Sequence, residues 1–452
     1  MKKKILITIS IISAVVIISI LWSIISGGYD KQNKSILYLK KIIPTKLART
    51  IRDTIFIIPN LQQENKILAL QVKKYEQGYN GELFQNKIIK TNDNKYEYNL
   101  KKFFLPFPRL DLNLGWKAEE NSKRAHYLEI VDDKIFVVSG LGEMIYFEKY
   151  NINKKKLNQT IIQNNIKELF NKSQNKFYGI RDLFYEDNYF YISILESEKE
   201  GFTINIYRAL KNFSNLKFEI FFKSNEFAKN YNLQTGGRIE SFHKNKILFS
   251  IGFLSKFDSA QNQKSLAGKI ISIDKSTKKF EILSLGHRNP QGLLYIKEKN
   301  LVINTEHGPK GGDEINLNFL SIIEKKDFGW PISSYGEPYS KQAASFYKEK
   351  GYLKKSHSDY GFKEPLKYFT PSIGISEIIY LKDNNSEKLL ASSLRAASIY
   401  FLEVDKKFQE VKSLSRLYLD NTRIRDLKYD EKSESIFMIL ENTPAVGILK
   451  SN

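Results

Sequence analysis

The chain has 452 residues, of which 42% are hydrophobic and 27% are charged, so it has enough apolar material to form the core of a globular protein. It contains no cysteine, which excludes disulfides, thiolate metal ligands and a cysteine nucleophile. The formal net charge is +21, but the basic residues are spread along the chain and mixed with acidic ones. Because nucleic-acid binding needs a concentrated basic surface, we expect no nucleic-acid partner.

The N-terminus has the pattern of a membrane segment. Lys2–Lys4 precede an uncharged run, Ile5–Ile25, that is rich in Ile, Val and Leu. As a helix this run spans roughly 30 Å, the thickness of a bilayer core. A cleaved signal peptide is the alternative, but its apolar region is shorter, and Ser26-Gly27-Gly28 is a weak cleavage site. The sequence predicts a single-pass inner-membrane anchor over residues 1–28, with its N-terminus in the cytoplasm and the rest of the chain in the periplasm.

Residues 29–102 form the next predicted segment. They carry short apolar and basic stretches that Pro44 and Pro59 interrupt. Because proline breaks a helix, the pattern predicts the short helices of a stalk or linker. A spacer is the simplest role for such a segment, and pairing with another chain is the alternative.

Residues 103–452 have the texture of β-structure, with short runs of Ile, Val, Phe and Tyr divided by Asp, Asn, Lys and Gly. Few candidate helices lie between these runs, which excludes alternating α/β units. A sandwich, a barrel and a propeller share this pattern. The length is too great for one sandwich, and at roughly 40–50 residues per blade it fits a propeller of six to eight blades. The predicted strands are 134–139, 143–148, 189–196, 202–209, 246–253, 269–274, 300–305, 377–381, 388–392, 398–404, 435–440 and 445–450.

A glycine-rich loop stands out within this region. The segment that begins at Gly286 has the sequence G-H-R-N-P-Q-G-L, followed by T-E-H-G-P-K-G-G-D-E-I-N and D-F-G-W-P. The glycines around Pro309 predict a tight turn with exposed main-chain carbonyls, and two carboxylates, Asp313 and Glu314, follow it. Oxygen ligands of this kind suit calcium. A structural turn with a surface ion pair is the alternative.

Five further motifs accompany this segment in a fixed order, and together they resemble the glucose/sorbosone dehydrogenase family. They are G-G-R-I-E-S-F (236–242), S-L-A-G-K-I-I-S-I-D (265–274), P-S-I-G-I-S (371–376), L-L-A-S-S-L-R (389–395) and N-T-R-I-R-D-L (421–427). The resemblance runs from about Ala125 to the C-terminus. It implies an all-β, six-bladed β-propeller that oxidises a sugar or polyol with calcium-bound pyrroloquinoline quinone and passes the electrons to a further acceptor.

The resemblance also implies roles for single residues. Arg288 falls on the arginine that faces the substrate, and the carbonyls of Gly308 and Pro309 fall on those that hold calcium. Glu314 lies where some members bind a second calcium ion. The implied cofactor contacts are Asn289, His307, Asp313, Ser372, Arg395, Arg423 and Arg425. Three arginines at one mouth suit a tricarboxylate, because guanidinium groups pair with carboxylates through two hydrogen bonds.

One family motif, G-L-L-G-x-A-x-H-P-D-F, departs from its pattern here. The family's general base is its histidine, whereas this chain has G-I-R-D-L-F-Y-E-D at Gly179–Asp187, with Glu186 in that place. Glu186 can act as a base only if burial raises its pKa, and a surface glutamate is the alternative. The family's tryptophan over the substrate falls on Thr370 or Phe369. The loss of the motif leaves a second hypothesis, a non-catalytic propeller that binds a sugar, an anion or a protein.

Overall fold

The computed structural model describes residues 81–107, 125–171, 174–231, 234–321, 326–382, 387–441 and 443–451. The predicted membrane anchor and the predicted stalk up to residue 80 lie outside this part of the chain. Among the described residues, no helix has the length and apolar character needed to cross a membrane.

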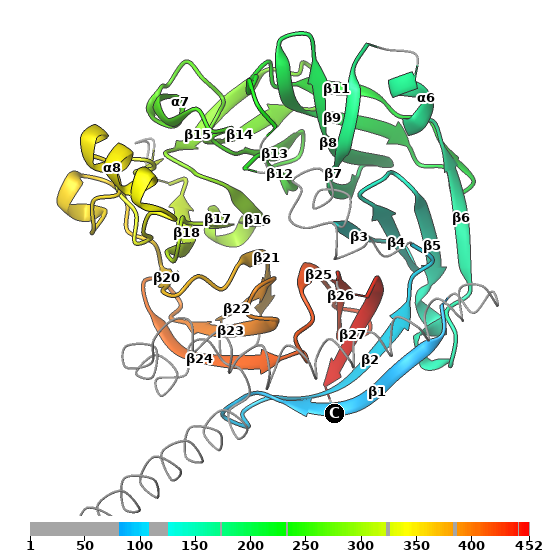
Figure 1. Ribbon diagram of the computed structural model, residues 1–452. Helices are drawn as coiled ribbons and strands as arrows, with labels where there is room; N and C mark the ends of the chain where they lie inside the picture. Colours follow the sequence, from blue (N-terminus) through cyan, green and yellow to red (C-terminus); the bar gives the residue numbers. More distant parts are fainter. Residues whose placement is uncertain are drawn as a thin grey trace, which may run out of the picture. The chain divides into compact units, whose positions relative to one another are not determined.

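Six β-sheets surround a common centre, as Figure 1 shows, which confirms the predicted six-bladed propeller. From the centre outward, blade 1 consists of β3 (His126–Val131), β4 (Lys134–Ser139), β5 (Met144–Glu148) and β6 (Gln159–Asn164). Blade 2 consists of β7 (Lys176–Glu186), β8 (Tyr189–Glu198), β9 (Gly201–Leu210) and β11 (Glu219–Lys223). Blade 3 consists of β12 (Gly236–Phe242), β13 (Lys246–Ile251), β14 (Lys269–Asp274) and β15 (Phe280–Leu285).

The other three blades have the same antiparallel order. Blade 4 consists of β16 (Pro290–Ile296), β17 (Leu301–Glu306), β18 (Asp313–Phe319) and β20 (Lys367–Phe369). Blade 5 consists of β21 (Ile375–Lys382), β22 (Glu387–Ser393), β23 (Ser398–Val404) and β24 (Val411–Tyr418). Blade 6 consists of β25 (Ile424–Asp430), β26 (Ser435–Leu440), β27 (Ala445–Ser451), β2 (Glu97–Phe104) and β1 (Leu83–Lys90). Two short strands, β10 (Asn215–Leu216) and β19 (Lys326–Asp327), add parallel to the outer edges of blades 1 and 3.

The ring closes between the two ends of the described chain. Strand β2 pairs antiparallel with β27, from Tyr98 opposite Ser451 to Phe104 opposite Ala445, and β1 pairs with β2. The predicted domain boundary at residue 103 is therefore wrong, because residues 83–102 belong to the last blade and not to a stalk. Strand β1 has Gln85, Asn86, Lys87 and Lys90 among its apolar residues, which suits its place at the outer edge, where all of its residues are exposed or half-buried.

Each pair of neighbouring blades shares a cluster of buried apolar side chains. At the closing seam, Phe103 from β2, Phe147 from β5 and Phe437 from β26 are all completely buried. Burying one such side chain stabilises the fold by roughly 1.5–3 kcal/mol. This seam therefore packs the last blade against the first.

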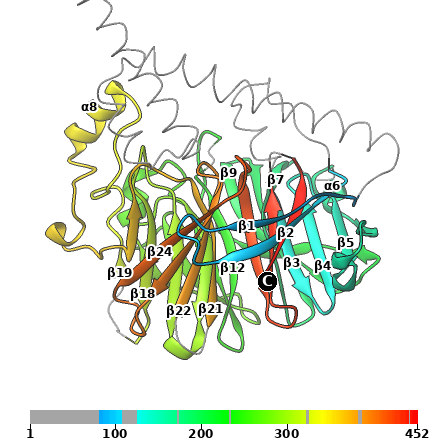
Figure 2. The ribbon, with the colours of Figure 1, turned by 90° about the horizontal axis from the view of Figure 1, so that it is seen from below.

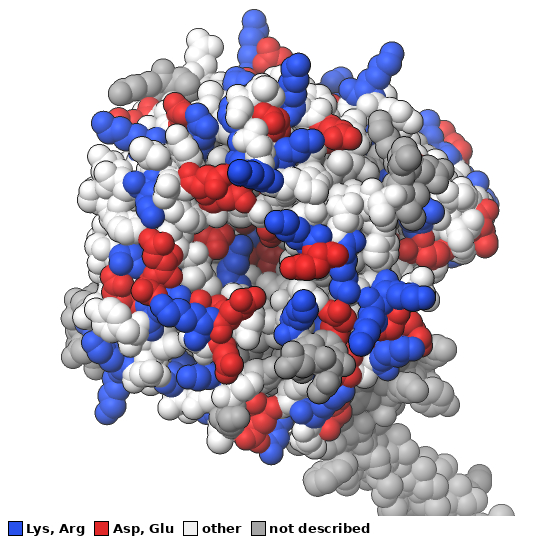
Figure 3. Space-filling view, turned by 180° about the vertical axis from the view of Figure 1, so that it is seen from behind, with Lys and Arg blue, Asp and Glu red and all other residues white. Residues whose placement is uncertain are grey.

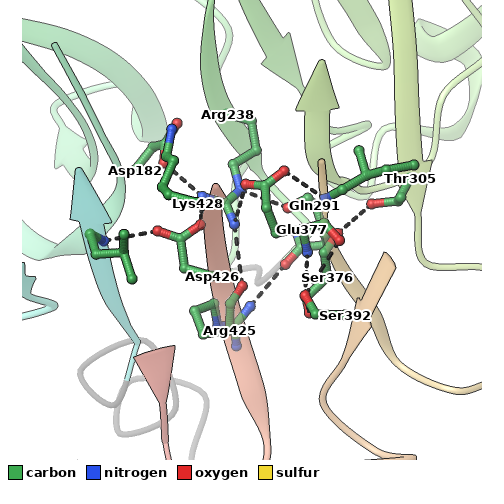
Figure 4. A network of polar contacts seen from close by, with 12 residues as sticks. Asp182, Arg238, Gln291, Thr305, Ser376, Glu377, Ser392, Arg425, Asp426 and Lys428 are labelled. Atoms are coloured by element: carbon green, nitrogen blue, oxygen red, sulfur yellow. Dashed lines mark hydrogen bonds and ion pairs between the residues drawn. The ribbon is translucent and has the colours of Figure 1, made fainter. Parts of the chain in front are cut away.

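The axis of the ring is polar, unlike the seams. Arg238, from inner strand β12, forms ion pairs with Asp182 of β7 (2.7 Å), Glu377 of β21 (2.9 Å) and Asp426 of β25 (3.1 Å), as Figure 4 shows. All four side chains are at least nine-tenths buried. Seen from the face opposite α8, the centre of the ring is hollowed, and acidic and basic side chains surround the hollow (Figure 3).

Arg238 also contacts the two remaining blades. Its Nε donates to the main-chain oxygen of Gln291 on β16 (2.6 Å), and its guanidinium carbon lies 5.0 Å from the ring centre of Tyr127 on β3. Burial by itself would lower the pKa of Arg238, but the three carboxylates outweigh that effect and raise it. One side chain therefore bridges all the other blades.

A long segment between β18 and β20 carries α8 (Lys341–Lys350), which lies beyond one end of the strands (Figure 2). His357 anchors this segment, since its Nε2 lies 3.1 Å from Oε1 of Glu314 and its Nδ1 lies 2.7 Å from Oγ of Ser333. Burial raises the pKa of Glu314. Burial alone would lower the pKa of His357, but the hydrogen bond and charge of Glu314 raise it overall.

We expect Arg238→Met to destabilise the ring, because the change leaves three buried carboxylates without their counter-charge. The free energy of unfolding should fall by roughly 3–5 kcal/mol, measured by denaturant titration. Arg208→Met is the matched control, since Arg208 pairs with the exposed Glu219 at the outer edge of blade 2, and it should cost no more than about 1 kcal/mol. Equal losses in the two variants would contradict the bridging role of Arg238.

We also expect the segment around α8 to loosen as the pH rises. The pKa values of His357 and Glu314 are both raised above those of the unfolded chain, so the docked segment binds more protons than the free one. Docking is therefore strongest below the unfolded pKa values and weakens as the pH rises through the folded pKa of His357. Amide exchange of residues 341–350, corrected for the intrinsic rate, should accelerate by about tenfold per unit of pKa difference.

His357→Gln should remove the part of the pH dependence that follows the titration of His357, because glutamine does not titrate, and should leave only that of Glu314. His243→Gln, in the turn after β12, should leave it unchanged. Identical pH profiles for the wild type and the His357 variant would show that the pair does not control docking.

Candidate active site

The beginnings of several inner strands meet at one end of the ring. Oδ1 of Asn289, just before β16, accepts a hydrogen bond from the main-chain N–H of Gly236 at the start of β12 (3.2 Å). Nη1 of Arg425, at the start of β25, donates to Oε1 of Gln291 (3.1 Å). We call this end of the ring the mouth. The resemblance placed Arg288, Asn289, Arg423 and Arg425 together, and the structure brings them to this end.

Arg288 lies on the floor of the mouth and is only 5% exposed. Its Nη1 donates to the main-chain oxygens of His307 (2.8 Å) and Gly308 (2.9 Å), and its guanidinium carbon lies 5.2 Å from the ring centre of Trp330. Its Nε is buried without a hydrogen-bond partner, and burial lowers the pKa of the side chain. A buried donor without an acceptor is costly, so this atom indicates a place for a ligand oxygen.

His307 has one fixed hydrogen bond. Its Nε2 lies 2.5 Å from the main-chain oxygen of Ile375 and must donate, because a carbonyl can only accept. Burial lowers the pKa of His307, with Arg425 and Arg288 adding to the effect and Asp313 opposing it. The neutral imidazole then carries its proton on Nε2 and leaves Nδ1 able to accept one.

Asp313 and Ser372 were predicted to contact the cofactor, but they bind the protein itself. Oδ1 of Asp313 accepts from the main-chain N–H of Gly308 (3.2 Å) and from the hydroxyl of Ser372. Oδ2 accepts from the N–H groups of Gly374 (2.6 Å) and Ile375 (3.1 Å). The completely buried Asp313 carboxylate therefore ties the glycine-rich loop of blade 4 to the start of blade 5.

The predicted metal ligands fit calcium only in part. Glu314 is engaged with His357, and the carbonyl oxygen of Gly308 already accepts from Arg288. In the described part of the chain, no three His, Asp or Glu side chains are arranged to hold a metal ion. A carbonyl oxygen has two lone pairs, so the oxygens of Gly308 and Pro309 remain the only predicted donors that suit such an ion.

Arg423 and Arg425 share one carboxylate, that of Glu441. Nε of Arg423 lies 2.6 Å from Oε2 of Glu441, and Nε of Arg425 lies 2.6 Å from Oε1. Burial by itself would raise the pKa of Glu441, but the two arginines lower it to about 2. Glu441 thus holds the two guanidinium groups side by side. The three side chains together keep a net positive charge. The third predicted arginine, Arg395, is exposed beside Gly374, whose loop Asp313 holds.

Glu186 lies at the other end of the ring, so the predicted base is wrong. Asp182 of β7 reaches Arg238 at the axis, and Glu186 follows four residues further along the same strand, roughly 13 Å away. Its carboxylate binds Lys275 (2.7 Å) and the hydroxyl of Ser241 (2.7 Å). A carboxylate held in this way at the far end of a strand cannot take a proton at the mouth. Of the two candidates for the family's tryptophan, Phe369 is core and Thr370 is exposed.

Several residues that build this end of the ring were not predicted from the sequence. Their contacts come from strands far apart in the chain, although one signal was present. Two arginines at alternate positions of a strand, as in R-I-R, point to the same face and need a carboxylate nearby. The residues missed were Arg181, Arg238, Gln291, Trp330 and Glu441.

Two curated proteins are similar in sequence to part of this chain. It is 27% identical over 211 residues to the aldose sugar dehydrogenase YliI of Escherichia coli, a match that covers 43% of this chain and 53% of that protein. It is 34% identical over 167 residues to the uncharacterized protein slr1608 of Synechocystis, covering 33% of this chain and 38% of that protein. The chain therefore spans about half the length, or less, of these curated relatives.

Solved structures share the fold. The apo-form of the soluble aldose sugar dehydrogenase of Escherichia coli matches with a TM-score of 0.57 at 18% identity, over 72% of this chain and 95% of that one. The PQQ-bound aldose sugar dehydrogenase of Streptomyces coelicolor matches with a TM-score of 0.52 at 16% identity, over 73% and 99%. The model of the Glucose / Sorbosone dehydrogenase family matches residues 126–449, which is most of the chain. This protein therefore belongs to the glucose/sorbosone dehydrogenase family.

Proposed function

We propose that this protein is a quinone-dependent dehydrogenase that oxidises a sugar or polyol at the mouth, with pyrroloquinoline quinone as its cofactor. The observation that carries the proposal is the pair Arg423 and Arg425, held side by side on the buried carboxylate of Glu441. Family membership supports it, as does the PQQ bound to the aldose sugar dehydrogenase of Streptomyces coelicolor.

The charge of the mouth suits this cofactor. Arg181, Arg288 and Arg395 add three positive charges to those of Arg423 and Arg425, and Glu441 is the carboxylate that faces the last two. An empty cluster of this kind repels itself, whereas a tricarboxylate neutralises it through charge-assisted hydrogen bonds. When bound, pyrroloquinoline quinone supplies a two-electron acceptor for the hydride of the substrate.

We also propose a calcium site, with fewer protein ligands than the sequence predicted. The oxygens of Gly308 and Pro309 would hold the ion, whereas Asp313 and Glu314 are engaged elsewhere. The protein then contributes only main-chain ligands, so we expect calcium to bind together with the quinone rather than before it.

The protein's own residues orient the alcohol and remove its proton. The carbonyls of His307 and Gly308 fix the guanidinium of Arg288, whose unpartnered Nε can donate to the substrate oxygen. His307 holds its own proton on Nε2 toward Ile375, so Nδ1 is the atom that accepts the hydroxyl proton. With the quinone bound, the alcohol would lose its hydroxyl proton to Nδ1 of His307 and a hydride to the quinone and would become a carbonyl, and a further acceptor would take up the two electrons.

The non-catalytic alternative loses its main support. It depended on the missing H-P-D-F motif, and the corresponding segment lies at the opposite end of the ring from the mouth. The loss of that motif does not bear on the chemistry of the mouth.

We further propose that the run Ile5–Ile25 anchors the protein in the inner membrane with the propeller in the periplasm, because the run is long, uncharged and preceded by lysines. The full-length chain should stay in the membrane fraction after an alkaline carbonate wash, and protease added to spheroplasts should cleave it. Release by carbonate, or protection from the protease, would contradict the anchor.

We expect the full-length chain, purified in mild detergent, to bind pyrroloquinoline quinone with calcium at micromolar concentration or below, measured by calorimetry. Arg425→Met should weaken binding by about tenfold or more, because a hydrogen bond to a charged group contributes roughly 1.5–3 kcal/mol. Glu441→Gln should also weaken it, although it raises the positive charge, because the two guanidinium groups lose their common support. His307→Asn should bind the quinone but reduce dye at a rate at least about a hundredfold lower.

Arg208→Met, far from the mouth, is the control and should match the wild type. No binding to the wild type rules out this cofactor. Tighter binding to the Glu441 variant would show that total charge, and not orientation, governs the site.

A further inference from the structure

Arg181 is a second guanidinium buried near the mouth. It lies in a β-bulge of inner strand β7, between Ile180 and Asp182, and is 7% exposed. The opposing residue on β12 is Gly237, where an added Cβ would lie 2.6 Å from Cβ of Arg181. A residue with a side chain at position 237 would therefore displace Arg181. The glycine leaves room for the arginine next to β12, which begins at the mouth.

No carboxylate of the described residues pairs with Arg181. Its Nη1 donates to the main-chain oxygen of the preceding Ile180 (3.2 Å), and its Nη2 is buried without a hydrogen-bond partner. The nearest carboxylate in sequence, Asp182, is used by Arg238 (2.7 Å) and by the N–H of Ile239 (2.7 Å). Arg181 differs in this respect from Arg238, Arg423 and Arg425, each of which binds a buried carboxylate.

The surroundings make this charge costly. Burial lowers the pKa of Arg181, the phenols of Tyr127 and Tyr231 partly oppose the effect, and the like charge of Arg425 adds to it. A charge taken out of water needs both a counter-charge and hydrogen-bond acceptors. The described protein offers one main-chain oxygen and, from Tyr231, a phenol. Among the described residues, the charge of Arg181 therefore has no anion to balance it.

We propose that Arg181 is an oxyanion-binding residue and receives a carboxylate of a ligand bound in the mouth. The identity of that ligand rests on the proposed function, and two ligands could supply the carboxylate. One is a carboxylate of the quinone, and the other is the acid group of an oxidised or acidic sugar, such as a uronate substrate. In either case the carboxylate accepts from Nη2, which then has the partner it lacks.

The test uses the full-length chain in detergent and the variants Arg181→Gln and Arg181→Lys, with Arg208→Gln as the control. Calorimetry measures three probes, which are pyrroloquinoline quinone with calcium, glucuronate, and neutral glucose. Arg181→Gln should lower the affinity for one of the two carboxylate probes by about tenfold or more. Its affinity for glucose should stay within about twofold of the wild type, and Arg181→Lys should recover part of the lost affinity. Loss for the quinone assigns Arg181 to the cofactor, and loss for glucuronate assigns it to the substrate.

Stability gives a second readout that a merely structural arginine would not produce. Because no described residue gives Arg181 an anionic partner, Arg181→Gln should unfold at the same or a higher denaturant concentration than the wild type. It should also lose the extra stability that the carboxylate probe confers on the wild type. Destabilisation of the ligand-free variant, or unchanged affinity for both carboxylates, overturns the proposal.

The two proposals fail separately. If the wild type binds the quinone and Arg181→Gln changes neither carboxylate affinity, Arg181 is not an anion site and the proposed function stands. If the wild type binds no quinone but holds glucuronate through Arg181, the cofactor is wrong and the anion site stands.

Discussion

The ring depends on one guanidinium at its axis. Six separate sheets can pack against each other through apolar seams, but such seams are non-directional and do not fix how the inner strands align at the centre. Arg238 supplies that direction, because its planar fork binds carboxylates from blades 2, 5 and 6 and a main-chain oxygen from blade 4. A network of this kind stabilises only when every member is paired, so the blades must reach one mutual alignment before the charges are satisfied.

Charge of opposite sign collects at the axis and at the mouth. Along the axis, carboxylates outnumber the basic residues Arg238 and Lys428, and burial raises the pKa of Glu240 to about 7. At the mouth, guanidinium groups outnumber the carboxylates. The two regions are in contact, because Nη2 of Arg238 donates to the main-chain oxygen of Arg425 (3.3 Å). The mouth therefore has an excess of positive charge that a bound anion would neutralise. This excess is the physical basis of the proposed cofactor site and of the role inferred for Arg181.

Several residues of the family pattern serve the protein scaffold and not the ligand. Both carboxylate oxygens of Asp313 accept hydrogen bonds from the loop and from the neighbouring blade. Glu314 binds His357 in the segment that carries α8. These contacts hold the loop that carries Gly308, whose carbonyl oxygen fixes Arg288. A carboxylate next to a binding loop is thus no sign of ligand contact by itself, because a tight turn also needs acceptors for its own N–H groups.

The sequence by itself determined the fold class and the family, and it pointed to Arg288, Arg395, Arg423 and Arg425 but not to Arg181. All twelve predicted strands are present, and apart from β21 they are the second and third strands of the blades, which show the expected runs of apolar residues. Of the six inner strands only β21 was predicted, since β7, β12 and β25 carry the charged residues of the axis and look like loops. Only the tertiary structure decided that β1 and β2 close the ring, that Glu186 lies away from the mouth, and that Glu441 joins Arg423 to Arg425. The physical reason is common to all three, because each depends on which end of a strand a residue occupies and on partners that the closed ring brings together from distant positions in the chain.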